Sequence, residues 1–329
     1  MDIELVDKRG FYKDFLSFGP RLQKQYNMLK NFDIGIEKRY SGIVISGMGG
    51  SGVVGDIIYD LLWDVIDIPI YVNKADHLPK FVNKDFLVIA VSYSGNTMET
   101  INAMLEADKR GTDIITVSSG GKLAELSREK GILHITINKA MAPRSALPEL
   151  LVGVLRILEN AVNVNFKTEV EEAARHLSKI ANEYTPSEYS EPMELARSLM
   201  GRIPIIYVPK ELMSIGIRAK TAFNENSKVN AYFDVYPEMF HNEVMAYDYE
   251  YNRSLKLIFV EGNSKINSFF EYLVNLGADP IHIEYPAQVN RLTAILQIIM
   301  KLDLASVYLA VLRGVDPYPV RLIDWLKKK

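Results

Sequence analysis

Short apolar runs alternate with stretches in which apolar residues recur at helical spacing through most of the chain. A short apolar run predicts a buried strand, and a spacing of three to four residues predicts an amphipathic helix. Strands are predicted in the first half at residues 41–46, 68–72, 85–92, 113–118 and 133–137. Helices are predicted at residues 52–63, 97–110 and 147–162. This alternation predicts a doubly wound, mostly parallel sheet flanked by helices.

A similar alternation of strand and helix patterns follows in the other half of the chain. It predicts strands at residues 203–208, 255–261 and 281–285, helices at residues 213–226 and 289–312, and a short helix at the end. Residues 164–190 are polar and broken at Thr185-Pro186-Ser187, so we interpret them as a partly helical connecting segment. A chain of 329 residues is long for one hydrophobic core. We therefore expect two α/β units, residues 1–150 and residues 151–329.

Composition and charge narrow the possible classes of function. The chain has no cysteine, which excludes disulfides, thiolate nucleophiles and cysteine-ligated metals. The formal net charge of -3 provides no basic field for a nucleic acid. The acidic start of the chain does not fit a signal peptide, and we expect no membrane span because no apolar run approaches about 20 residues. The expectation is a cytoplasmic protein without a nucleic-acid or membrane partner.

A glycine-rich loop, Gly47-Met48-Gly49-Gly50-Ser51-Gly52, joins the first predicted strand to a helix. Glycines let the backbone approach a ligand, and the N–H groups of a helix start favour an anion. The alternative is a tight turn that needs glycine for its own geometry. The spacing also fits the dinucleotide fingerprint, but the next strand ends in Asn73 and Lys74 rather than in the acidic residue that binds ribose.

A second loop, Ser92-Tyr93-Ser94-Gly95-Asn96-Thr97, places three hydroxyl side chains before a helix. The spacing of Asn96 and Glu99 also suits a capping box, so local helix capping is an alternative. Two such loops in one sheet favour an oxyanion ligand. Hydroxyl and amide donors suit a phosphate that must be bound and then released.

Three side chains are candidates for acid–base chemistry, and each has an alternative. His241 lies in a polar and aromatic segment without helix or strand period, as in a binding loop. Glu225 ends a helical pattern, where a solvated glutamate is the simpler interpretation, although the helix dipole disfavours an anion there. Arg144 follows a strand and by default forms a surface ion pair. The other histidines are assigned to the core (His134 and His282), to a polar turn (His77) and to solvent (His176).

Taken together, these motifs resemble a known family. The segment Val91–Thr97 resembles the phosphosugar loop of sugar isomerase (SIS) domains, and Gly47–Gly52 resembles their glycine-rich loop. The chain is similar over nearly its whole length to the archaeal-type bifunctional phosphoglucose/phosphomannose isomerases. The resemblance implies two SIS-type units, no cofactor and no metal. It also implies reversible isomerisation of glucose 6-phosphate, and of mannose 6-phosphate, with fructose 6-phosphate through a cis-enediolate, a reaction of glycolysis and gluconeogenesis.

The resemblance also implies roles for individual residues. The phosphate would be held by Gly49, Gly50, Ser51, Ser92, Ser94 and Thr97. Glu225 would be the proton-transfer base, and Arg144 would stabilise the enediolate. His241 would open the sugar ring and would reach the active site across the interface of a homodimer. Lys327 is a possible further substrate-binding residue, with Lys328 and Lys329 as competitors.

Three other functions stay open at this point. A non-catalytic SIS regulator would bind a sugar phosphate and report it to a partner, usually through a DNA-binding domain. An amidotransferase that forms glucosamine 6-phosphate would need a glutaminase with an N-terminal cysteine. A nicotinamide enzyme would need the missing ribose-binding acid.

Overall fold

The computed structural model describes residues 3–32, 35, 38–261 and 264–327. Contacts divide the chain into two compact units. The five-stranded unit comprises Phe18–Ser178 and Asn290–Thr293, and the four-stranded unit comprises Met1–Ser17, Lys179–Val289 and Ala294–Lys329. The sequence boundary after residue 150 stays a prediction. By contacts, the main division falls after Ser178, because two further helices pack within the five-stranded unit.

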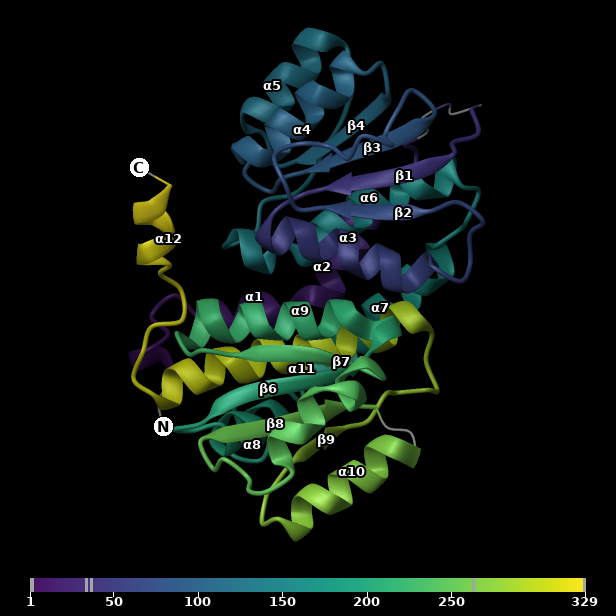
Figure 1. Ribbon diagram of the computed structural model, residues 1–329. Coiled ribbons are helices and arrows are strands. Elements are labelled where there is room, and N and C mark those ends of the chain that lie inside the picture. Colours follow the sequence, from purple (N-terminus) through teal and green to yellow (C-terminus); the bar gives the residue numbers. More distant parts are fainter. Residues whose placement is uncertain (1–2, 33–34, 36–37, 262–263, 328–329) are drawn as a thin grey trace. The chain divides into compact units, whose positions relative to one another are not determined.

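The five-stranded unit contains one parallel sheet of strand order β2-β1-β3-β4-β5 (Figure 1). Its strands are β1 (Gly42–Ser46), β2 (Ile70–Asn73), β3 (Phe86–Val91), β4 (Asp113–Ser118) and β5 (Leu133–Thr136). Every residue of β1 and of β3 is buried, as is usual for central parallel strands. The strand order reverses between β1 and β3, so the connections that leave these two strands run in opposite directions across the sheet.

Helices cover both faces of this sheet. They are α2 (Phe18–Met28), α3 (Gly49–Leu62), α4 (Met98–Lys109), α5 (Gly121–Lys130), α6 (Leu147–Ala161) and α7 (Lys167–Ile180). Helices α4 and α5 lie on one face and α3 on the other, as right-handed crossovers on either side of the reversal require (Figure 1). Helix α6 packs against α2 and α3.

The four-stranded unit repeats this architecture with the order β7-β6-β8-β9, again all parallel. Its strands are β6 (Ile203–Pro209), β7 (Tyr232–Tyr236), β8 (Leu255–Val260) and β9 (Ile281–Ile283). Its helices are α1 (Phe11–Leu16), α8 (Glu191–Ser198), α9 (Met213–Ala222), α10 (Ser264–Asn275), α11 (Arg291–Leu312), which starts in the other unit, and α12 (Arg321–Leu326). Helices α9 and α11 lie on one face of the sheet and α10 on the other (Figure 1).

The predicted fold class, two doubly wound units with parallel sheets, is confirmed. The sequence missed β7 and the helices α1, α2, α5, α8 and α10, and it described α7 only as part of a connecting segment. The predicted helix at residues 213–226 is α-helical only to Ala222. Gly262, where the strand at residues 255–261 was expected to stop, lies outside the described residues.

One helix has the length of a membrane span. Helix α11 is 22 residues long and apolar enough to cross a bilayer by length and composition, although Lys301 and Asp303 interrupt its apolar run. In the structure, 83% of its most apolar window is buried inside the protein. Its apolar surface therefore serves as core.

Candidate active site

The two predicted phosphate loops meet at the point where the strand order of the five-stranded sheet reverses. The glycine-rich loop follows β1 and leads into α3, and the hydroxyl-rich loop follows β3 and leads into α4. The Tyr93 N–H group donates to Ser51 Oγ at 3.1 Å, so the loops contact each other directly. Ligands of open α/β sheets bind in the crevice at this place because the two helices lie on opposite faces.

Three hydroxyl oxygens at this point already accept a hydrogen bond from the protein. Ser51 Oγ accepts from Tyr93 N–H, Thr97 Oγ1 accepts from the Ser92 hydroxyl at 2.9 Å, and Ser94 Oγ accepts from Asn96 N–H at 3.2 Å. Since a hydroxyl has one proton to donate, each of these three keeps its own O–H for another partner. An anion needs donors of this kind.

The four serine and threonine side chains of the two loops differ in burial. The side chain of Ser92 is 1% exposed and Ser51 is 8% exposed, whereas Thr97 is half-buried and Ser94 is exposed. The set therefore extends from the interior of the unit to its surface. The predicted phosphate residues are thus brought together, although their role is not tested by the geometry alone.

Arg144 lies beside the glycine-rich loop. It belongs to a short 3₁₀ turn, Pro143–Ser145, and is 5% exposed. A Cβ atom at Gly50 would stand 3.3 Å from the Cα atom of Arg144 and 3.4 Å from the carbonyl oxygen of Pro143. Only glycine lets the two backbones pack this closely without displacement. The structure therefore groups Arg144 with the phosphate loops in one unit.

Tyr93 links these parts, and sequence reasoning missed its role. Its hydroxyl donates to the carbonyl oxygen of Ala140 at 2.8 Å and accepts from the Ala140 N–H group at 2.9 Å. Its own carbonyl oxygen accepts from the N–H group and the hydroxyl of Ser119. One residue thus connects both loops to the segment that carries Arg144. An aromatic side chain among hydroxyls was the only signal in the sequence.

Glu225 occupies an unusual turn in the four-stranded unit. The α-helix α9 ends at Ala222 and widens into a π-helical turn at Phe223–Ser227. Such turns are rare, and many of them occur at functional sites. The Glu225 side chain is partly exposed, whereas Asn226 and Ser227 are fully buried beside it. The turn therefore presents Glu225 from a fixed backbone.

Helix α11 anchors this turn. The Asn226 amide donates to Ser306 Oγ at 2.8 Å, and the Ser227 hydroxyl donates to the Ser306 carbonyl oxygen at 2.5 Å. Asp303 lies one turn before Ser306 on α11. Its carboxylate binds the guanidinium of Arg218 on α9, with Nε–Oδ1 and Nη2–Oδ2 distances of 2.9 and 2.8 Å. Both side chains of this ion pair are buried.

The other two candidates of the four-stranded unit lie at its surface. His241 ends the 3₁₀ turn Glu238–His241 and is exposed. Lys327 follows α12 directly and is exposed, while Lys328 and Lys329 lie outside the described residues.

Two of the remaining histidines bear on the sequence analysis. His134 is half-buried, its Nδ1 atom lies 2.7 Å from Thr116 Oγ1, and burial lowers its pKa. Its ring nitrogen has a partner, as predicted, but the side chain is half-buried and not in the core, because β5 is an edge strand. His282 is exposed, so its assignment to the core was wrong, because β9 is the edge strand of its sheet.

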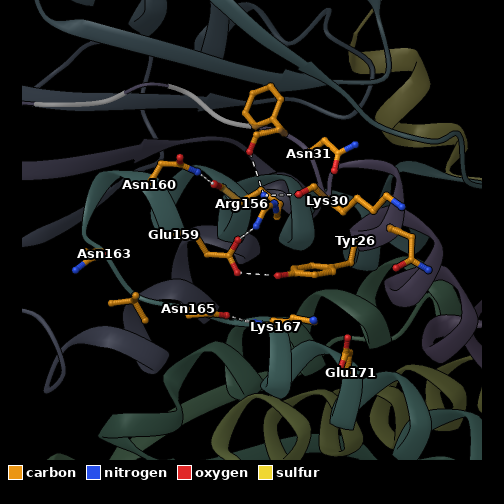
Figure 2. A pocket seen from close by; sticks show the side chains of 13 residues that line it. Tyr26, Lys30, Asn31, Arg156, Glu159, Asn160, Asn163, Asn165, Lys167 and Glu171 are labelled. Carbon is orange, nitrogen blue, oxygen red and sulfur yellow. Dashed lines mark hydrogen bonds and ion pairs between the residues drawn. The ribbon is translucent and has the colours of Figure 1, made fainter.

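A cavity of about 720 Å³ lies in the five-stranded unit, but none of the predicted site residues lines it. It is bordered by the ends of α2 and α6 and by the start of α7 (Figure 2). Its central charges are already satisfied: Glu159 pairs with Arg156 and accepts from the Tyr26 hydroxyl at 3.0 Å (Figure 2). Arg156 also donates to the carbonyl oxygens of Leu29, Lys30 and Phe32. We interpret this cluster as structural, because it connects α6 to the end of α2 and to the residues that follow it.

Within the described ranges, no group of three or more histidine, aspartate or glutamate side chains is arranged to hold a metal ion.

Two α/β units, each with a parallel sheet, and a glycine-rich and a hydroxyl-rich loop at the switch point of one sheet define a double SIS-type protein. Comparisons with known proteins support this class. The family model described as bacterial phospho-glucose isomerase C-terminal SIS domain matches residues 188–329. A hypothetical protein from Thermus thermophilus has the same fold, with a TM-score of 0.76 at 15% identity over 99% of this chain and 94% of that one.

Curated relatives define the family more closely. The bifunctional phosphoglucose/phosphomannose isomerase of Aquifex aeolicus is 35% identical over 88% of this chain and 90% of its own length. The protein of the same name from Caldicellulosiruptor bescii is 32% identical over 94% and 95%. The chain belongs to the family of bifunctional phosphoglucose/phosphomannose isomerases. A D-glucosamine-6-phosphate 4-epimerase from Sulfolobus acidocaldarius is also similar, with 27% identity over 90% and 92%.

Proposed function

We propose that the protein interconverts glucose 6-phosphate, and mannose 6-phosphate, with fructose 6-phosphate. The single observation that carries the proposal from the structure is the set of three hydroxyls, Ser51, Ser94 and Thr97, whose oxygens already accept from the protein. Their protons are left to donate to an oxyanion at the strand ends. Membership of the isomerase family supplies the reaction.

The proposed mechanism divides the work among few side chains. The two loops hold the phosphate, with the Gly49 and Gly50 backbone beside the hydroxyls. His241 transfers the ring proton and opens the cyclic sugar, a task suited to an imidazole near neutral pH. Glu225 removes the proton from C2 of the aldose and returns it to C1 of the enediolate. Arg144 stabilises the negative charge that develops on the enediolate oxygens.

The proposed mechanism explains how one active site could isomerise both aldose 6-phosphates. Glucose and mannose 6-phosphates differ only in configuration at C2, and C2 becomes planar in the enediolate. A single base next to C1 and C2 therefore serves both epimers, provided that the C2 hydroxyl is accepted in either orientation.

The surface position of His241 supports a further part of the proposal. An exposed ring-opening residue is compatible with a homodimer in which each subunit contributes His241 to its partner's site. Lys327, equally exposed, would add a second cation to the sugar. We propose such a dimer, acting in the cytoplasm within glycolysis and gluconeogenesis.

The test is a coupled assay that offers glucose 6-phosphate, mannose 6-phosphate and glucosamine 6-phosphate separately. We expect the first two to yield fructose 6-phosphate. Glu225→Gln should lower kcat by about 10²- to 10⁴-fold, the range of general base catalysis, while leaving the Kd of the sugar phosphate nearly unchanged. Glu129→Gln, at an exposed position on α5, is the matched control.

The alternatives predict different results. A wild-type protein that binds sugar phosphates by calorimetry but converts none would be a non-catalytic regulator. Epimerisation of glucosamine 6-phosphate alone would place the chain with the 4-epimerase. Full turnover by Glu225→Gln would eliminate Glu225 as the base.

A further inference from the structure

A chain of hydroxyl and carboxyl groups lies next to the segment that carries His241. Tyr207 on β6 is fully buried, and its hydroxyl donates to Glu243 Oε1 at 2.6 Å. The hydroxyl of Tyr247, which is 3% exposed, lies 2.6 Å from the Tyr207 hydroxyl. With Tyr207 donating to Glu243, Tyr247 donates to Tyr207, and the bonds run in one direction. Hydrogen bonds in such a chain strengthen one another.

Asp234 on β7 adds a second carboxyl group to this chain. Burial raises the pKa of the Glu243 carboxyl, and Asp234 raises it further through a hydrogen bond and through its like charge, against the opposing effect of Tyr207. Two adjacent carboxylates cannot both ionise at low cost, so the neighbouring Asp234 charge favours the protonated form of Glu243. The Glu243 Oε1 atom accepts the hydrogen bond from Tyr207. Asp234 in turn accepts from the Val235 N–H group at 2.7 Å.

The segment around His241 has little regular structure of its own. It consists of two short 3₁₀ turns, Glu238–His241 and Glu243–Tyr247, separated by Asn242. Such turns have poorer hydrogen-bond geometry than an α-helix and stabilise themselves weakly. Met239 is buried on one side of His241, and the Glu243 side chain is held on the other. The exposed histidine is thus fixed at both of its flanks.

Holding a surface turn by a partly buried carboxyl group is energetically unfavourable. Partial burial of an ionisable group costs free energy, and an apolar side chain of similar volume would fill the space against Tyr207 at less cost. What a hydrogen-bonded carboxyl provides instead is a defined direction, because the short bond from Tyr207 fixes the position of its Oε1 atom.

We propose that Glu243 is a positioning residue, which holds the His241 imidazole in the orientation required for ring opening. The inference rests on the proposed ring-opening role of His241. It assigns to Glu243 no contact with the substrate.

The experiment compares a cyclic substrate with one that cannot close. Fructose 6-phosphate forms a furanose through its C5 hydroxyl, whereas 5-deoxyfructose 6-phosphate lacks that hydroxyl and stays open. Ring opening is therefore needed only for the first. Glu243→Leu removes the acceptor of the Tyr207 hydrogen bond, and Glu243→Gln keeps it because its amide mimics a protonated carboxyl. Glu238→Leu is the exposed control on the same segment.

We expect Glu243→Leu to lower kcat/KM for fructose 6-phosphate by about 10- to 100-fold, as misplacement of a catalytic group by about 1 Å does, and to spare the open analogue. Glu243→Gln should restore turnover of the cyclic substrate. Equal losses on both substrates, or an equal loss in Glu238→Leu, would overturn the proposal. If Glu243→Leu does not fold, Tyr207→Phe gives the same comparison by removing the hydrogen bond to Glu243 from the other side.

His241→Ala tests the ring-opening role separately from the role of Glu243. If this variant no longer converts the cyclic substrate but still converts the open one, His241 opens the ring and the Glu243 comparison is decisive. If kcat/KM falls equally for both substrates, the ring-opening role of His241 is wrong, whatever the result for Glu243.

Discussion

The hydroxyl of Tyr93 offers a direct test of how the candidate site is held together. Tyr93→Phe keeps the ring but removes a group that donates to the Ala140 carbonyl at 2.8 Å and accepts from the Ala140 N–H at 2.9 Å. Each such bond contributes about 1 kcal/mol net, so the segment loses about 2 kcal/mol. Because 1.4 kcal/mol corresponds to a factor of ten, local opening should rise about 30-fold.

Hydrogen exchange of the Ala140 amide measures this opening directly. We expect exchange about 30-fold faster in Tyr93→Phe, from the two bonds lost. We also expect a fall in kcat for fructose 6-phosphate, since Arg144 lies four residues further along the segment. Tyr71→Phe is the matched control, because Tyr71 is exposed on the edge strand β2 and its ring packs on Phe81. Unchanged exchange at Ala140 together with unchanged kcat would refute the reasoning.

Three further predictions concern binding and stability. Thr97→Val should raise KM for the phosphohexose by about 10- to 100-fold with little change in kcat, because a hydrogen bond to a charged group contributes about 1.5–3 kcal/mol. Inhibition by inorganic phosphate should weaken by a similar factor. An unchanged KM would show that Thr97 does not bind the phosphate. Asp303→Ala should lower the free energy of unfolding by about 3–5 kcal/mol in urea titrations, because it removes the carboxylate that is paired with the buried Arg218 guanidinium. The folded state raises the pKa of Glu243 above its usual 4.5, so the stability that this group contributes is present below 4.5 and is lost as pH rises through the folded value. Glu243→Gln should therefore gain stability relative to the wild type as pH rises from acid to neutral, and a pH-independent difference would contradict the raised pKa of Glu243.

The central strands and the loops at their ends could be predicted because their signals are local. Strand β3 is a continuous apolar run, as a strand buried on both faces must be, and β1 is similar. Glycines and hydroxyls directly after these strands marked the two loops that the structure brings together. Strand β7 (Tyr232–Tyr236) was missed because an edge strand is mostly half-exposed and carries a mixed pattern. The same cause led His282 to be assigned to the core.

The local shape of the turn that carries Glu225 could not be predicted either. Residues 213–226 follow one helical pattern, and no residue type marks the change from α- to π-helix at Phe223. In the structure, the Asn226 and Ser227 side chains of this turn bond to Ser306, about 80 residues further along the chain.

The sequence by itself determined the fold class, the two loops and the residue types available for acid–base chemistry, because each of these depends on neighbours along the chain. Only the tertiary structure decided which groups support them. The bond from Tyr93 to Ser51 spans 42 positions, and the bond from Tyr207 to Glu243 spans 36. Contacts of this kind form when strands pair and helices pack across a sheet, and no periodicity in one sequence specifies which distant side chains will meet.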